Sequence, residues 1–129
     1  MGGRGTYAKG NNVPYQWKTD IKIDGIKALV GLGKGVHKLP VESHSSGVYA
    51  RLDHDGTLRE LRFYDGNRNL RLEIAYHPEA PLARRAGVPL DQPILHYHTY
   101  DANLNRTRAD FLTPAMRKRY SRLFGRKWK

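Results

Sequence analysis

Short segments of alternating apolar and polar residues, separated by turns rich in Asp and Gly, are the feature that most restricts the fold of this 129-residue sequence. The separators are Asp24-Gly25, Asp53-His54-Asp55-Gly56 and Asp65-Gly66-Asn67. Asp and Gly favour the tight turns of β-hairpins, because they tolerate the positive φ angles that such turns need. The pattern therefore predicts an antiparallel meander.

Six segments have the composition of strands. They are predicted over residues 17–23, 26–32, 48–52, 57–64, 69–77 and 94–100. The segment 69–77 alternates most cleanly, because Leu70, Leu72, Ile74 and Tyr76 fall on one side and the residues between them on the other. Side chains in a strand alternate between the two faces of a sheet, so the apolar set is expected to face the core.

The end of the chain has the signals of a helix. Thr113 suits the N-cap, Pro114 suits the first helical position, and Gly125 is expected to stop the helix. Between them an apolar stripe at helical spacing consists of Met116, Tyr120, Leu123 and Phe124. The predicted fold class is α+β, a twisted antiparallel sheet of about five to six strands with one C-terminal helix packed on one face. Residues 17–129 are expected to form a single domain, preceded by a flexible segment 1–16, and residues 78–93, with four prolines, are expected to form a long loop.

The charge of the chain is strongly positive. Lys and Arg number 23 against 12 Asp and Glu, which gives a net charge of +11. Such an excess attracts polyanions, so nucleic acid is the expected partner, although part of the excess lies near the C-terminal end of a helix, where cations are favoured without a partner. The cations expected to contact nucleic acid are Arg62, Arg106, Arg108, Arg117, Lys118, Arg122 and Lys127. No membrane partner is expected, because no apolar run approaches membrane-spanning length and no signal peptide is recognisable; a cytoplasmic or virion-associated location is expected.

Two histidines, His96 and His98, stand two residues apart in the predicted strand 94–100. Side chains at this spacing point to the same face of a sheet. Two neighbouring imidazoles can bind a metal ion, transfer protons or form structural hydrogen bonds, and the spacing alone leaves these three uses open.

If strands 69–77 and 94–100 pair, Arg71, Glu73 and His77 lie beside the two histidines on an exposed sheet face. RNA cleavage by internal transesterification needs such groups: a base for the 2′-hydroxyl, an acid for the leaving oxygen and a cation for the charged phosphorane. Arg matches phosphate with two parallel hydrogen bonds, so Arg71 or Arg62 suits the clamp. DNA lacks the 2′-hydroxyl, so RNA is the expected substrate.

Other uses of these residues compete with catalysis. Arg and Glu on a strand face form ordinary cross-strand pairs, and histidines beside aromatic residues are often satisfied core residues. A metal site formed by the two histidines with His77 or Glu73 is a rival use, but the expectation is that no metal or other cofactor is needed. His44 and Ser45, in a polar loop near Pro40, are further candidate site residues.

Several motifs resemble a domain found at the end of minor head proteins of phages that infect Gram-positive bacteria. The motifs span nearly the whole chain: residues 2–7 (GGRGTY), 37–40 (HKLP), 42–46 (ESHSS), 62–65 (RFYD) and 94–98 (ILHYH). This resemblance implies an association with phage head components.

The stretch from Arg62 to His77, followed by His96 and His98, also resembles polymorphic bacterial toxin domains of the barnase–EndoU–colicin–RelE class, which are metal-independent ribonucleases. The resemblance implies catalytic roles for the two histidines with Glu73 and His77, implies a phosphate-clamp role for Arg71, and makes an inhibitor or immunity protein a candidate partner. An Asp-His-Gly segment before the last strand, found in those toxins, is missing here. Two alternative functions are therefore expected. The first is an endoribonuclease-like domain, and the second is a non-catalytic basic module of a phage head protein that holds nucleic acid.

Overall fold

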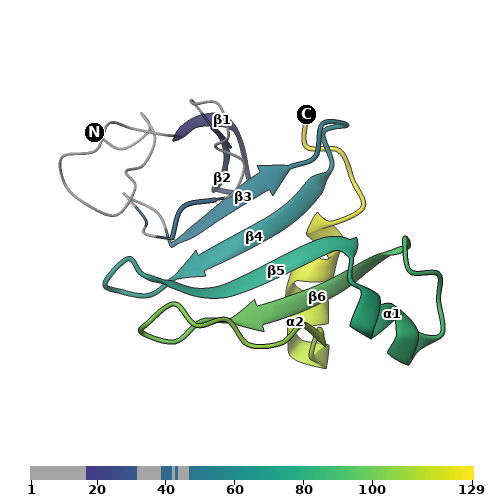
Figure 1. The fold of residues 1–129 in the computed structure, drawn as a ribbon. Coiled ribbons are helices and arrows are strands. Elements are labelled where there is room, and N and C mark those ends of the chain that lie inside the picture. The colour runs from purple at the N-terminus through teal and green to yellow at the C-terminus, as the bar shows by residue number, and fades with distance from the viewer. Residues whose placement is uncertain (1–16, 32–38, 42, 44–46) are drawn as a thin grey trace.

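The computed structural model describes residues 17–31, 39–41, 43 and 47–129 of the chain. Within them the chain forms seven strands and two α-helices (Figure 1). The strands are β1 (Trp17–Ile23), β2 (Ile26–Gly31), β3 (Val48–Leu52), β4 (Leu58–Tyr64), β5 (Leu70–Pro78), β6 (Pro93–Thr99) and β7 (Asp110–Phe111). The helices are α1 (Ala80–Ala86), α2 (Pro114–Tyr120) and the short 3₁₀ helix η1 (Ser121–Leu123). The predicted flexible segment 1–16 lies outside the described residues.

All seven strands belong to one sheet, in which their order follows the chain from β1 to β7. Each neighbouring pair is antiparallel except β2 and β3, which run parallel. The predicted meander is therefore correct apart from this pair. The chain between Gly31 and Val48 is long enough for the crossover that parallel neighbours need. The predicted turn between β1 and β2 is confirmed, because Asp24 and Gly25 both have positive φ angles, 52° and 79°.

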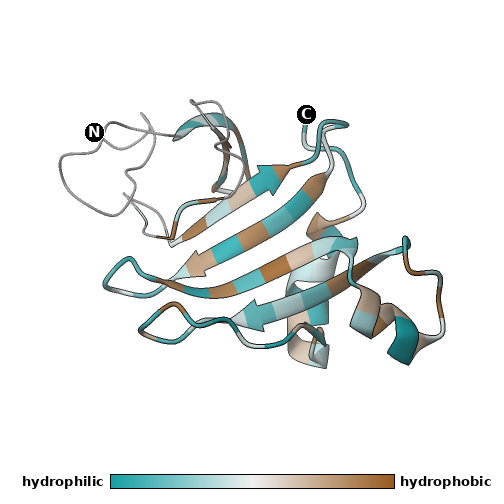
Figure 2. Ribbon diagram, in the orientation of Figure 1, coloured by the Kyte–Doolittle hydropathy of each residue, from teal (hydrophilic) through white to brown (hydrophobic). Residues whose placement is uncertain are grey.

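One face of the sheet is apolar and carries α2. Its core includes Leu61 of β4 and Ile74 of β5, which pack with Leu123, Phe124 and Trp128 from the C-terminal part of the chain. Figure 1 shows α2 crossing behind β5 and β6. The hydrophilic and hydrophobic residues that alternate along β4 and β5 in Figure 2 explain why only one face of these strands is apolar.

The opposite face combines polar side chains with two small apolar clusters. One cluster, around Trp17, Tyr49 and Leu70, lies toward the β1–β3 end, and the other joins Leu82 and Ala83 of α1 to Ile94 of β6. The polar residues of this face that are buried are Glu60, Arg62, Glu73, His96 and His98. We call these five residues the polar belt.

The C-terminal helix starts as predicted and ends earlier. Thr113 is its N-cap and accepts a hydrogen bond from the backbone N–H of Met116, with Pro114 at the first position. The α-helix ends at Tyr120, and Leu123 lies in η1. The predicted apolar stripe nevertheless packs against the core through Met116, Tyr120, Leu123 and Phe124.

The predicted loop over residues 78–93 was wrong in part, because it contains α1. This helix has Pro81 in its first turn and ends at Gly87 in the left-handed conformation, with φ 70°. Seven residues are two turns, too few for a clear periodic pattern, so only these start and stop signals mark the helix in the sequence. Two helices and seven strands therefore replace the predicted single helix and five to six strands.

Candidate functional site

The pairing of β5 with β6 brings the predicted histidines and Glu73 to one face of the sheet. Glu73 is opposite His98, Ala75 is opposite His96, and His77 is opposite Ile94. Since residues two apart share a face, Glu73, His77, His96 and His98 all stand on the polar side. The juxtaposition expected from the sequence is therefore present in the sheet.

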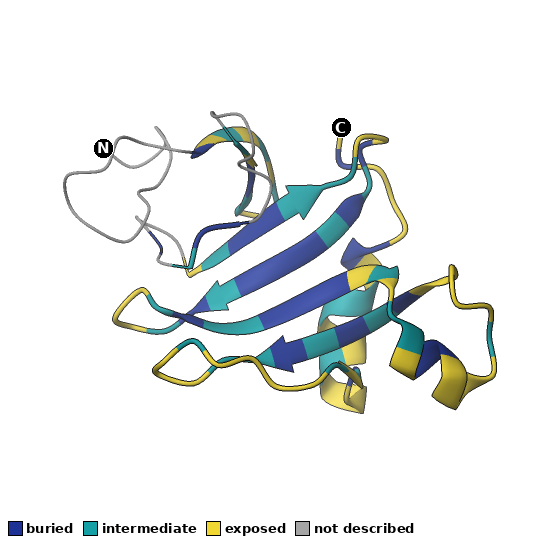
Figure 3. Ribbon diagram, in the orientation of Figure 1, coloured by how far each residue is buried: buried dark blue, intermediate teal, exposed yellow. Residues whose placement is uncertain are grey.

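The expectation that this face is exposed was wrong. His96 is 0% exposed, His98 4% and Glu73 3%, whereas His77 is half-buried. Figure 3 shows buried residues running through the middle of the central strands. The covering comes partly from α1, which packs on Ile94, and partly from the β6–β7 connection, whose Thr107 backbone bonds to Thr99. Sequence patterns describe single strands, so they did not show these covering segments.

Glu73 and Arg62 form a buried ion pair. The Arg62 Nε donates to Glu73 Oε1 at 2.9 Å, and a second guanidinium nitrogen donates to the Leu39 carbonyl at 2.7 Å. Both side chains are more than nine-tenths buried. Arg62 was expected to contact nucleic acid or clamp a phosphate, and Glu73 to be catalytic, but the structure places each of them inside the protein with the other as its partner.

Arg71 lies apart from the histidines. Its Nε bonds to Asp65 Oδ2 at 2.9 Å, and its other donors reach the carbonyl groups of Leu70 and Asp101. Asp65 lies in the β4–β5 turn and Asp101 follows β6, so Arg71 ties these two connections together. Arg62, and not Arg71, is the guanidinium beside Glu73.

The three histidines of the polar face each use Nδ1 in the same way. In His77, His96 and His98 this atom lies 2.9, 2.7 and 2.8 Å from a backbone carbonyl oxygen. A carbonyl only accepts, so Nδ1 carries the proton, and in the neutral ring Nε2 keeps its lone pair. Burial lowers the pKa of His96 and favours this neutral form. The rings stack edge to face, with centroid separations of 4.7 Å for His77–His96 and 5.5 Å for His96–His98.

Glu79 is a site residue that the sequence reasoning missed. It occupies the N-cap of α1, but its side chain makes no capping hydrogen bond. Instead, one ligand atom from each of Glu79, His96 and His98 lies within 4.8 Å of the other two. The signal that could have found it was a carboxylate at a helix start directly after a strand of the histidine face.

A hollow opens beside this cluster, between α1 and the β6–β7 connection. Its lining includes Glu79 and Arg85 from the α1 side, and His98, Arg106 and Arg108 from the other side. The three arginines are exposed. Arg85 also stacks on the Phe111 ring, with its guanidinium carbon 5.1 Å from the ring centre, which holds it at the rim. The hollow therefore joins a carboxylate, an imidazole and a positive rim.

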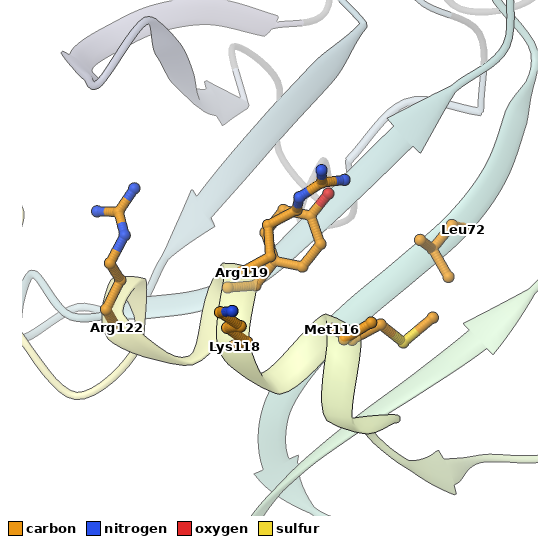
Figure 4. A pocket seen from close by; sticks show the side chains of 7 residues that line it. Leu72, Met116, Lys118, Arg119 and Arg122 are labelled. Carbon is orange, nitrogen blue, oxygen red and sulfur yellow. The ribbon is translucent and has the colours of Figure 1, made fainter.

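The remaining predicted cations lie elsewhere. Arg117 and Lys118 are exposed on α2, Arg122 follows in η1 bonded to Asp24, and Lys127 pairs with Thr57 in an isolated β-bridge. A second pocket lies on the apolar face, and its lining includes Leu72, Met116, Lys118, Arg119 and Arg122. Figure 4 shows Leu72 and Met116 close together, with Arg122 at the other end of the helical segment. The predicted site residues His44 and Ser45 lie outside the described residues.

Comparisons of the chain with known protein families, curated proteins and solved structures found no match. Among the described residues, no helix has both the length and the apolar character needed to cross a bilayer. The case for a function therefore rests on the residues of the site.

Proposed function

We propose that the chain is an endoribonuclease-like domain that cleaves RNA by internal transesterification in the hollow beside α1. The observation that carries the proposal is the lining of this hollow, which combines Glu79 and His98 with the positive rim of Arg85, Arg106 and Arg108. The resemblance of residues 62–77 and 96–98 to toxin ribonucleases supports the same chemistry. The resemblance to phage minor head proteins makes head components or an inhibitor protein candidate partners.

The proposed chemistry assigns a role to each lining group. The Glu79 carboxylate takes the proton of the 2′-hydroxyl as the P–O2′ bond forms, and the protonated His98 ring delivers a proton to the 5′-oxygen as the P–O5′ bond breaks. The bond from His98 Nδ1 to the Thr107 carbonyl fixes the ring, which leaves Nε2 for this transfer. Arginine side chains at the rim bind the phosphate and stabilise its additional negative charge in the transition state.

Cleavage of a single-stranded RNA oligonucleotide in the presence of EDTA tests the proposal. His98→Ala is expected to lower the rate by about 10²–10⁴-fold, the usual contribution of a proton-transfer group. The matched control is His54→Ala, since His54 is exposed in the β3–β4 turn, away from the hollow lining. The product should carry a 2′,3′-cyclic phosphate, and a substrate with a single 2′-deoxy sugar at the cleaved bond should resist.

Three results would overturn this assignment. Equal cleavage by the wild type and the His98 variant would indicate a contaminating nuclease. Cleavage of the 2′-deoxy substrate would exclude the transesterification route. The absence of any cleavage would exclude catalysis.

A specific observation also favours the second candidate, a non-catalytic basic module that holds nucleic acid. The pocket on the apolar face is lined by three cations, Lys118, Arg119 and Arg122, together with the aromatic ring of Tyr120 (Figure 4). Such a surface can pair with phosphates while a base stacks on the ring. Binding measured across a salt series tests it, because each lost phosphate contact should flatten the log–log slope by about 0.7 for a single strand. A slope unchanged in Lys118→Ala/Arg119→Ala would exclude this surface.

A further inference from the structure

The Nε2 atom of His96 is buried, and among the described residues it has no hydrogen-bond partner. The side chain is fully enclosed, with an exposed fraction of 0%. Buried polar atoms in proteins nearly always have a partner, and one without is destabilising. Its Nδ1 already bonds to the Ile94 carbonyl, so the lone pair of Nε2 is the part of the ring that lacks a ligand.

We propose that His96, His98 and Glu79 form a binding site for a divalent transition-metal ion, with Zn²⁺ as the representative. One ligand atom of each residue lies within 4.8 Å of the others. Two imidazoles and one carboxylate are a set that binds zinc with a fourth position open, and the same set suits other first-row metals. Mg²⁺ and Ca²⁺ prefer oxygen ligands, so they are poor candidates.

The hydrogen bonds that hold the two histidine rings also fit a metal site. Histidines that bind metal through Nε2 usually donate their Nδ1 proton to a carbonyl or carboxylate, which fixes the ring and its tautomer. His96 donates to the Ile94 carbonyl and His98 to the Thr107 carbonyl, at 2.7 and 2.8 Å. Both rings are therefore held before a metal arrives, and both direct the same type of nitrogen away from the backbone.

The site needs a small contraction to bind the ion. Two ligands held about 2.1 Å from a tetrahedral zinc are about 3.4 Å apart, so atoms separated by up to 4.8 Å must approach each other. Glu79 can supply this movement, because it is half-buried and makes no capping bond to α1. The two imidazoles are anchored on β6 by their Nδ1 bonds, so any adjustment between them is limited to rotation of the rings.

Metal binding would oppose the cleavage proposed above, and this consequence rests on that proposed function. The ion would occupy the carboxylate of Glu79 and the Nε2 of His98, which are the groups assigned to proton transfer. Zn²⁺ is therefore expected to inhibit the RNA cleavage that EDTA permits. Metal binding itself is measured without RNA, so failure of the site and failure of the nuclease are distinguishable.

Zinc titration of the EDTA-stripped and dialysed protein by calorimetry, with metal analysis after dialysis, tests the site. One equivalent of Zn²⁺ is expected per chain, together with a higher melting temperature. Glu79→Gln and His98→Asn should each weaken binding by about 10-fold or more, because each removes a ligand. His77→Asn is the matched control, since its ring lies 4.7 Å from that of His96 but outside the ligand cluster.

X-ray absorption at the zinc edge provides a readout that does not depend on the variants folding normally. Two imidazole nitrogens with oxygen ligands at about 2.0–2.2 Å are expected for the wild type. Substoichiometric zinc, or affinity that is unchanged in both ligand variants, would overturn the site. So would weakening in His77→Asn equal to that in His98→Asn, because it would point to a general effect on the histidine face.

Discussion

The two faces of the central sheet are buried to a similar degree by different chemistry. Ile74 and Glu73 are neighbours in β5, exposed by 0% and 3%, yet one packs among aliphatic and aromatic side chains and the other holds a guanidinium. Apolar packing has no directional demand, so the apolar face tolerates many side-chain combinations of suitable volume. The polar belt depends on directional partners such as the Arg62–Glu73 pair, which makes it more sensitive to single changes.

Breaking the Arg62–Glu73 pair is expected to have the largest effect. Glu73→Ala removes the carboxylate bonded to Arg62 and leaves that charge buried with the Leu39 carbonyl and the Tyr100 ring beside it, so it should cost about 3–5 kcal/mol of unfolding free energy. Ile74→Ala, one residue along on the other face, should cost about 2–5 kcal/mol through lost burial and a cavity. Urea unfolding followed by circular dichroism measures both.

The double variant Arg62→Met/Glu73→Met separates the two mechanisms. It removes both charges and keeps apolar volume, so it should recover most of the stability that Glu73→Ala loses. A loss of less than about 1 kcal/mol in Glu73→Ala, the range of exposed ion pairs, would mean that water reaches the pair in solution. The polar face would then be more open than the structure describes.

The sequence predicted the apolar face better than the polar one. Alternation along β5 correctly identified Leu72 and Ile74, and the stripe from Met116 to Phe124 packs with them, because period and burial are linked within a single element. Leu70 packs instead in the cluster on the opposite face, and Tyr76 is 37% exposed. The turns were also predictable, since Asp24-Gly25 needs positive φ angles that few other residue pairs tolerate.

For the polar face, alternation along each strand predicted which residues share a side, and the pairing of β5 with β6 was a supposition. The register that puts Glu73 opposite His98 comes from the structure. The ion pair of Glu73 with Arg62, the cover provided by α1 and the position of Glu79 all depend on contacts between elements, for which one sequence has no local signal. Arg62 and Arg71 are both strand arginines near Glu73 in the sequence pattern. The structure separates them, because Arg62 is opposite Glu73 in the β4–β5 pairing and Arg71 bonds to Asp65.

The pH dependence of folding stability tests whether Glu60 is buried in the polar belt. Burial, and after it the charge of Glu73, raises the pKa of Glu60 above its ordinary value, while Arg62, Arg51 and His77 act in the opposite direction. The folded state therefore keeps this proton to higher pH than the unfolded state. Its contribution to stability is greatest below the unfolded pKa and is lost as pH rises through the folded pKa.

Glu60→Gln removes this titration. The stability of the variant relative to the wild type should increase as pH rises from about 4 to 8, with a slope of at most about 1.4 kcal/mol per pH unit. Urea midpoints of both proteins at matched pH values measure the difference, and the other carboxylates cancel in the comparison. A stability difference between the two proteins that stays constant over this range would contradict the prediction. It would show that Glu60 ionises as easily in the folded as in the unfolded protein, for example because Arg51 approaches it more closely than 3.8 Å.

The caps of the two helices give the smallest expected effects and the sharpest contrast. Thr113 caps α2 with a side-chain hydrogen bond of 3.2 Å, so Thr113→Ala should cost about 1 kcal/mol. Glu79 stands at the equivalent position of α1 without a capping bond, so Glu79→Ala in EDTA should change stability by less than about 0.5 kcal/mol. Both helices have seven residues and a Pro in the first turn, which makes the pair well matched.

Equal costs for the two cap substitutions would contradict this contrast. They would mean that the Glu79 carboxylate caps α1 in solution, and a carboxylate bonded to the backbone of α1 is unavailable to the hollow. The proposed base for RNA and the proposed third metal ligand would then be lost together. A stable Glu79→Ala variant that has lost zinc binding would instead show that the cap position of α1 serves the site and contributes little to the fold.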